Sequence, residues 1–267
     1  MTSNNILVPI DFSDQSFNAL EKSFDLARNT DSAITLINVD EGIEIDANAK
    51  IQKLAQEFSK LSGIKINTII VKGNIYRQII STAKKLDSKF IVMGFNSSKG
   101  INNIGHNVYR VLRHSPCPLI TIKGKRQKND YRNVLLPLDL TKQTREKVKN
   151  AIAFSKIFHS TIHVVSVRLH KEKNYDNKLT SYANQVKAHI KKEGLACTMK
   201  TLEGDAIAQL VVGYAAEINA DLIIIMSQQN LNIKELFVGT NSQKIVQLSE
   251  IPVLTIRPIR RKAVARY

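Results

Sequence analysis

Residues 5–39 of the chain are NILVPIDFSDQSFNALEKSFDLARNTDSAITLINV, and they align without a gap to residues 133–167, NVLLPLDLTKQTREKVKNAIAFSKIFHSTIHVVSV. Later landmarks repeat in the same order, with the offset between copies rising only from 128 to 134: Gly73 with Gly204, 90–93 with 223–226, Gly105 with Gly239, and 118–122 with 252–256. Ordered matches over such a length indicate an internal repeat. The chain is therefore predicted to hold two copies of one unit, residues 1–128 and residues 129–267.

Each copy alternates apolar runs with amphipathic segments. The runs at 6–8 and 135–136 are typical of strands buried in a parallel sheet, and each is followed by Pro-x-Asp. Ser13 and Thr141 are placed to cap the helices that follow, and Gly63 and Gly194 are placed to end the second helix of each copy. Further strands are expected at 34–39, 66–71, 90–93 and 118–122, and in the second copy at 162–167, 197–202, 222–226 and 252–256.

Five strands alternating with four helices predict the fold class α/β, as two tandem doubly wound domains. Each domain is expected to be a five-stranded parallel sheet with helices on both faces, because right-handed crossovers place them there. Ligands of such sheets usually bind in a crevice at the carboxyl ends of the strands, beside strand 1, where the strand order reverses. The residues at these ends are Pro9, Asp11 and Gly94 in the first copy and Pro137, Asp139 and Ser227 in the second.

Composition adds one unusual number, a formal net charge of +16, in a chain with 43% hydrophobic and 23% charged residues. The excess is shared, since the first 128 residues carry 18 basic and 11 acidic residues and the rest carry 21 and 12. Denser basic clusters occur only at 123–132, interpreted as a linker, and in the tail 257–267. Nucleic-acid binding through a basic surface is therefore only a lesser alternative.

Two further classes are disfavoured. No apolar run approaches the ~20 residues that a membrane-spanning helix needs, so a cytoplasmic protein without a membrane partner is expected. Cys117 and Cys197 match neither a disulfide framework nor a thiol metal site, and His163 is expected on a strand with His159 before it, which disfavours a shared metal. No nucleophile and base motif is found, so an enzyme is not expected, although slow nucleotide hydrolysis stays open.

Several stretches together resemble the universal stress protein family in its tandem form. They are ILVPIDFS at 6–13, VMG at 92–94, VLRHSPCPL at 111–119 and FVGTNSQKIV at 237–246. The resemblance covers both copies nearly end to end. It implies an architecture like that of flavodoxin and of the adenine nucleotide alpha hydrolases, and a role in the stress response.

Members of this family that bind ATP share a loop of the pattern Gly, two residues, Gly, nine residues, Gly, then Ser or Thr. Glycines let backbone amides approach phosphate oxygens at a helix N-terminus. The first copy has Gly94, then Ser97 for the second glycine, seven intervening residues and Gly105 followed by His106. The second copy has Ser227 and Asn230 for both glycines, eight intervening residues and an intact pair, Gly239 and Thr240. Neither loop is complete, so no cofactor is certain, and ATP or another adenine nucleotide is an alternative.

The candidate ligand residues each have a structural alternative. Asp11 and Asp139 could contact a ribose or an adenine, but Pro-x-Asp is also a good exit from a strand into a turn. The glycines before the last helices could hold an anion or could serve only as helix caps. The pair Gly239 and Thr240 makes the second copy the slightly better place for a phosphate, and Gly94 keeps the first in contention. The remaining crevice candidates are Val39, Val167, His106 and Asn241.

Two main hypotheses follow. The first is a stress-response binding module whose copies pair through 118–122 against 252–256 into an intramolecular pseudo-dimer, because such strands would otherwise be exposed edges. The second adds an adenine nucleotide or a small anion in one or both crevices. A homo-oligomer of the whole chain is also possible.

Overall fold

The computed structural model describes residues 4–40, 46–96, 105–123, 130–141, 144–168, 173–227 and 241–258 of the 267-residue chain. The first half consists of β1 (Asn5–Pro9), α1 (Asp14–Asn29), β2 (Ala33–Asp40), α2 (Ala47–Ser62), β3 (Ile66–Lys72), α3 (Ile75–Lys85), β4 (Phe90–Gly94), α4 (His106–His114) and β5 (Leu119–Ile122). The second half repeats this order with β6 (Asn133–Leu138), α5 (Thr144–Phe158), β7 (Thr161–Arg168), α6 (Lys173–Lys192), β8 (Cys197–Glu203), α7 (Ile207–Glu217), β9 (Leu222–Met226), α8 (Asn241–Leu248) and β10 (Val253–Ile256).

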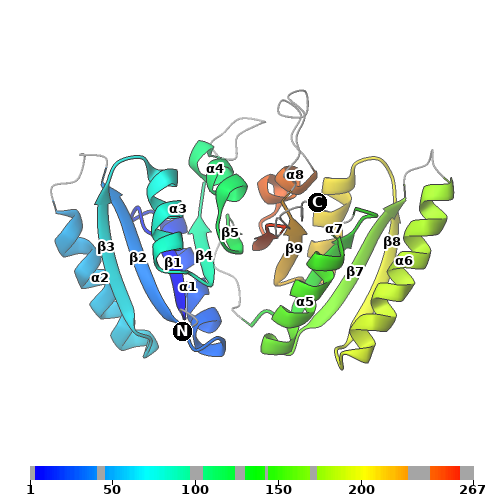
Figure 1. Ribbon diagram of the computed structural model, residues 1–267, viewed down its shortest axis with the longest axis horizontal. Helices are drawn as coiled ribbons and strands as arrows, with labels where there is room; N and C mark the ends of the chain where they lie inside the picture. Colours follow the sequence, from blue (N-terminus) through cyan, green and yellow to red (C-terminus); the bar gives the residue numbers. More distant parts are fainter. Residues whose placement is uncertain are drawn as a thin grey trace, which may run out of the picture.

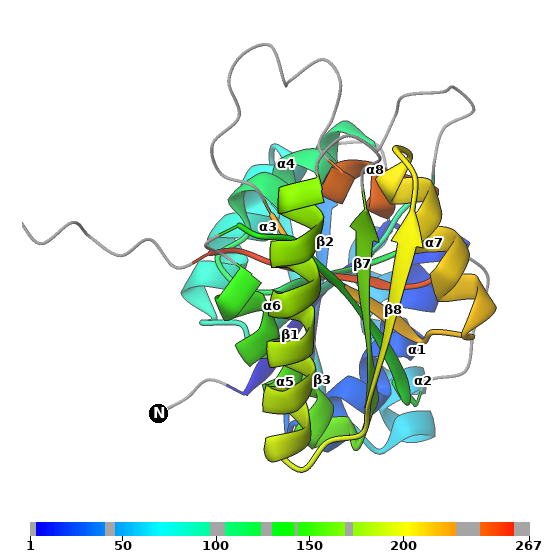
Figure 2. The same ribbon diagram turned by 90° about the vertical axis from the view of Figure 1, so that its right-hand side faces the viewer.

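All of these strands belong to one ten-stranded sheet with the order β3-β2-β1-β4-β5-β10-β9-β6-β7-β8. Within each half the strands are parallel, and β1 lies between β2 and β4 as β6 lies between β7 and β9. Figure 1 shows the two halves side by side with similar layers, and Figure 2 shows α6 packed along one side of β7 and β8. The predicted α/β fold of two tandem parallel-sheet units is confirmed.

Successive side chains of each strand point to opposite faces of the sheet, which explains why helices cover both faces. In β1, Ile6 and Val8 enter one apolar core and Leu7 enters the other, and all three are fully buried. The first core is completed by α1, α2, α5 and α6, and the second by α3, α4, α7 and α8. Two-sided burial is what the apolar strand sequences demand.

The helix ends show how local sequence sets the elements. The hydroxyl of Ser13 accepts a hydrogen bond from Ser16 N at 3.3 Å, so the predicted cap of α1 is confirmed. Gly63 ends α2 with φ 71°, a left-handed conformation that glycine adopts without strain. The hydroxyl of Thr141 donates to the carboxylate of Asp139, as that of Ser13 does to Asp11, and α5 is described from Thr144, so the cap at Thr141 stays a prediction.

The two halves meet through β5 and β10, which pair antiparallel with Ile120 opposite Leu254. Both strands are buried along their whole length. The pairing of the final strands expected from the sequence is therefore present. The two parallel sheets join into one because their last strands meet.

Basic residues that follow the two last strands make equivalent contacts across this seam. Lys123 Nζ donates to the carbonyl of Gln247 at 2.9 Å and lies 3.0 Å from Glu250 Oε1. Arg257 Nη1 donates to the carbonyl of Ser115 at 3.2 Å. Each cation thus binds a carbonyl at the C-terminal end of the last helix of the other half, where the helix dipole favours positive charge.

An aromatic cluster crosses the same seam. Tyr131 is fully buried, with its ring centroid 5.4 Å from that of Phe154 and 4.9 Å from that of Phe158. Phe90 of β4 contacts Phe154 of α5 edge to face at 6.5 Å. The interpretation of 123–132 as a plain linker is wrong at Tyr131, because this side chain belongs to the core between the halves.

Tyr131 also binds α1 of the first half. Its hydroxyl donates to the carbonyl of Lys22 at 3.3 Å, and Lys22 Nζ lies 5.3 Å from the ring centroid. Tyr131→Ala is predicted to lower the free energy of unfolding by about 3–5 kcal/mol, because it empties a packed aromatic site. Tyr131→Phe keeps the ring and loses one hydrogen bond, so a loss of about 1 kcal/mol is expected.

Urea unfolding followed by circular dichroism measures both changes. The phenylalanine variant is the control that separates packing from hydrogen bonding. An alanine variant as stable as the phenylalanine variant would contradict the role given to the ring.

Candidate functional site

The fold brings the predicted crevice residues of each half to the carboxyl edge of neighbouring strands. In the first half Pro9 ends β1, Val39 lies near the end of β2 and Gly94 ends β4, with Asp11 just beyond β1. In the second half Pro137 lies near the end of β6, Val167 near the end of β7 and Asp139 and Ser227 directly after β6 and β9. Ser97, Gly239 and Thr240 lie outside the described residues, as does the side chain of His106.

Asp11 is exposed and shapes the turn between β1 and α1. Its Oδ1 accepts hydrogen bonds from the backbone N, at 3.1 Å, and the hydroxyl of Ser13. The same hydroxyl caps α1, so the carboxylate orients the cap. This arrangement is the strand-to-turn exit that the sequence offered as the structural alternative.

Gly94 has a packing role that the sequence did not reveal. A Cβ added to it would lie 2.0 Å from the carbonyl oxygen of Gln15 and 2.9 Å from Ser16 N, a backbone contact that no side chain tolerates. The glycine is therefore required by the close approach of β4 to the first turn of α1, whether or not a phosphate binds beside it.

Gly105 stands at the N-terminus of α4 without a side-chain cap, and a Cβ added there would meet open space. His106 is the first helical residue. In the second half Asn241, the first residue of α8, is exposed, and Ser242 Oγ of the same turn donates to the carbonyl of Met226 at 2.9 Å. Ser227 N donates to the carbonyl of Ile256 at 2.8 Å, which anchors the strand end.

Asp139 is held far more firmly than Asp11. Its Oδ1 accepts from the backbone and hydroxyl of Thr141 and from the hydroxyl of Thr144, while Oδ2 lies 3.6 Å from Lys147 Nζ. Burial raises the pKa of Asp139, but Lys147 and the threonine donors together outweigh it and hold this pKa below its ordinary value.

Sequence reasoning missed Lys147, which lies next to Asp139 at the carboxyl edge of the second half-sheet. Its side chain is only 5% exposed, and burial lowers its pKa while Asp139 raises it. The first half has Ala19 at the equivalent position, so a lysine in the buried stripe of α5 was the available signal. Both carboxylate oxygens of Asp139 are thus engaged by protein groups.

The described residues bring no metal cluster together: no group of three or more His, Cys, Asp and Glu side chains could hold an ion. His163 lies on β7, where its ring nitrogens face Thr198 Oγ1 at 2.8 Å and Asn133 Oδ1 at 3.2 Å. His159 precedes the strand with φ 51°, as part of the turn.

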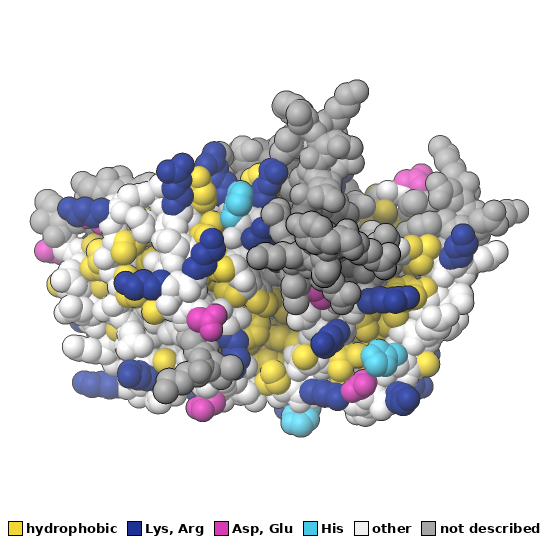
Figure 3. All heavy atoms as spheres, in the orientation of Figure 1, with side chains coloured by type: hydrophobic (Ala, Val, Ile, Leu, Met, Phe, Trp, Pro, Cys, Tyr) yellow, Lys and Arg dark blue, Asp and Glu magenta, His cyan; other side chains and the backbone are white. Residues whose placement is uncertain are grey.

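Basic side chains are spread over both halves on the face shown in Figure 3. Arg77 Nε donates to the hydroxyl of Tyr76 at 3.1 Å, and the guanidinium of Arg110 lies 4.7 Å from that ring. Among the described residues, no helix has the length and apolar character needed to span a membrane.

The difference between the two aspartates leads to a paired prediction. Asp139→Asn is expected to lower the free energy of unfolding by about 3 kcal/mol, because it leaves the buried Lys147 without its counter-charge. Asp11→Asn, with Ala19 at the lysine position, is expected to cost about 1 kcal/mol or less. Lys147→Met keeps the volume and removes the desolvated charge, so it is expected to be neutral or stabilising.

Acid titration gives the same pair a pH signature. The pKa of Asp139 in the folded protein is below its ordinary value of 3.8, so the folded state releases this proton more readily than the unfolded state. The stabilisation that ionised Asp139 gives the folded state is complete above the ordinary pKa of the group. It is lost as the pH falls through the pKa that Asp139 has in the folded protein. Denaturant unfolding of wild type and Lys147→Met at pH 7 and pH 3 measures it, and an equal loss in both proteins on acidification would contradict the assignment.

Comparison with known proteins agrees with this repeated architecture. The sequence model of the universal stress protein family matches residues 2–123 and again residues 130–257. A universal stress protein of Methanocaldococcus jannaschii is 26% identical over 141 residues, covering 44% of this chain and 81% of the relative.

Solved structures share the fold over nearly the whole chain. A universal stress protein from Archaeoglobus fulgidus superposes with a TM-score of 0.79 at 22% identity, covering 96% of this chain and 99% of that one. A functionally unknown protein from Pseudomonas aeruginosa gives 0.71 at 18% identity, covering 96% and 92%. With two matches of the family model that together span most of its length, this chain belongs to the universal stress protein family.

Proposed function

We propose that this protein is a stress-response binding module whose two halves form an intramolecular pseudo-dimer. The observation that supports the proposal is the antiparallel pairing of β5 with β10, in which Val253, Leu254 and Thr255 lie opposite Thr121, Ile120 and Leu119. The pairing uses the edges of both half-sheets within one chain. On this proposal the domain boundary lies near residue 128, between the paired units.

The reciprocal contacts of Lys123 and Arg257 support the same proposal. Each reaches the last helix of the opposite half, which favours one mutual orientation of the halves. The aromatic cluster around Tyr131 adds apolar burial on the face of α1 and α5. On this proposal, a partner of the module would meet both halves as one continuous surface.

X-ray scattering combined with light scattering tests this arrangement. A single compact body per 30.0 kDa chain is expected. Thr255→Pro is predicted to open the seam, because the backbone groups of Thr255 face Leu119 of β5 and proline removes this donor, which is poorly tolerated inside a sheet. Thr255→Val is the matched control and should keep the compact form. Two separated lobes in the wild-type protein would contradict the proposal.

A second candidate is the binding of an adenine nucleotide or a small anion in the first crevice. The observation that favours it is the difference between the aspartates: the described bonds of Asp11 use one oxygen of an exposed carboxylate, whereas Asp139 has both oxygens engaged. A ribose hydroxyl can be hydrogen-bonded by an accessible carboxylate. We therefore prefer the first half as the nucleotide or anion site, although in the sequence the pair Gly239 and Thr240 slightly favoured the second half.

Titration calorimetry with ATP, ADP and AMP tests the nucleotide proposal. One site per chain is expected, with Asp11→Asn weakening the affinity about tenfold, because a charged hydrogen bond is worth about 1.5–3 kcal/mol. Asp139→Asn is the matched control and should leave the affinity within twofold. Absence of heat with all three nucleotides at millimolar concentration would overturn this candidate and leave the pseudo-dimer untouched.

A further inference from the structure

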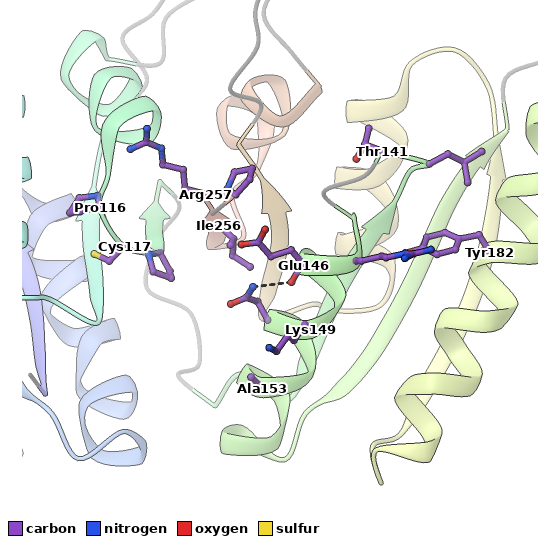
Figure 4. A pocket seen from close by; sticks show the side chains of 14 residues that line it. Pro116, Cys117, Thr141, Glu146, Lys149, Ala153, Tyr182, Ile256 and Arg257 are labelled. Atoms are coloured by element: carbon purple, nitrogen blue, oxygen red, sulfur yellow. Dashed lines mark hydrogen bonds between the residues drawn. The ribbon is translucent and has the colours of Figure 1, made fainter. Parts of the chain in front are cut away.

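A groove of about 1300 Å³ lies where the two halves meet, and at one end it reaches Leu140 and Thr141, which follow Asp139. One wall is Pro116, Cys117 and Pro118 of the first half, and the opposite wall is the exposed side of α5. Figure 4 shows Glu146 and Lys149 extending from α5 toward the wall that contains Pro116 and Cys117.

The wall of the first half is neutral and held in place. Ser115 Oγ donates to the carbonyl of Cys117 at 2.6 Å, and Arg257 Nη1 donates to the carbonyl of Ser115. Burial raises the pKa of the Cys117 thiol to about 12, so this side chain is uncharged at neutral pH. Prolines on both sides of it restrict the backbone further.

The β10 end of the groove adds apolar surface from Ile256 and Pro258, on either side of Arg257 in the chain. On α5, the exposed Ala153 leaves space where a longer side chain would project. The lining therefore combines apolar patches with a few charged groups, which is the usual composition of a small-molecule site.

The charges of the lining favour an acid. The described lining residues include three cations, Arg145, Lys149 and Arg257, and one carboxylate, Glu146. The chain beyond Pro258 has four basic residues and no acidic one in 259–267, so its charge does not complement the groove. An anionic occupant from outside the chain fits the positive excess better than this tail does.

Comparison of the two halves shows that this chemistry is particular to α5. Where α5 has Arg145, Lys149 and Ala153, the aligned positions of α1 have Phe17, Glu21 and Asp25. The fold requires neither set, since both helices pack on the same kind of sheet with other residues. At these positions the exposed side of α5 is thus basic and has a small side chain at Ala153, whereas that of α1 carries two acidic residues.

We propose that the groove between α5 and residues 116–118 binds a small organic anion, a carboxylate, sulfonate or phosphate ester carried on an apolar body. Lys149 attracts the acidic group, and Arg257 adds positive charge at the other end of the groove. Pro116, Pro118 and Ile256 contact the apolar body. Because both halves supply lining residues, binding also links the ligand to the joined state of the chain.

The aromatic sulfonate 1-anilinonaphthalene-8-sulfonate is the probe for the first test, followed by its fluorescence at constant salt. Lys149→Glu, which restores the charge found at Glu21 of α1, is expected to weaken binding roughly tenfold or more by charge reversal. Ala153→Trp fills the groove without altering its charge and is expected to weaken binding to a similar extent. Lys84→Glu makes the same charge change on the exposed surface of α3 and should leave binding within twofold of wild type.

Displacement distinguishes an anion site from general apolar adsorption. Decanoate is expected to displace the probe and decanol is not, because only the former has the acidic group. Probe binding within twofold of wild type in both Lys149→Glu and Ala153→Trp would overturn the proposal, as would equal displacement by decanol. Displacement by ATP that Asp11→Asn abolishes would assign the probe to the first crevice and likewise overturn it.

Discussion

The antiparallel pairing of β5 with β10 is the interaction on which the rest of the molecule depends. A five-stranded doubly wound unit ends in a strand whose outer edge has no partner of its own. Here both last strands are apolar and fully buried, and each supplies the other's missing neighbour. The repeat of the sequence therefore becomes a single sheet rather than two separate ones.

Several other features exist only because this seam is closed. Lys123 and Arg257 reach helix ends of the opposite half, and Tyr131 completes an apolar cluster that neither half could enclose alone. The groove beside α5 has one wall from each half, so it too is a product of the pairing. Stability and the candidate anion site share one structural cause.

The two crevices show how copies of one unit diverge while their packing is conserved. Gly94 is fixed by the backbone of α1, and its counterpart in the second half is Ser227. Lys147 replaces Ala19 and ties up Asp139, whereas Asp11 remains exposed. These differences argue against equivalent ligand sites in the two halves. They favour one ligand site in the first crevice and a second, chemically different one in the groove beside α5.

The sequence by itself determined the duplication, the strand and helix order, the α/β class and the meeting of the last strands, because periodicity, caps and edges are local or repeated signals. It also placed Pro9, Asp11, Pro137 and Asp139 at the carboxyl edge. Only the tertiary structure decided what those residues touch: the backbone beside Gly94, the buried charge of Lys147 under Asp139, and the burial of Tyr131 in a stretch that looked like a linker. These depend on distances between segments far apart in the chain, which no pattern of neighbouring residues encodes.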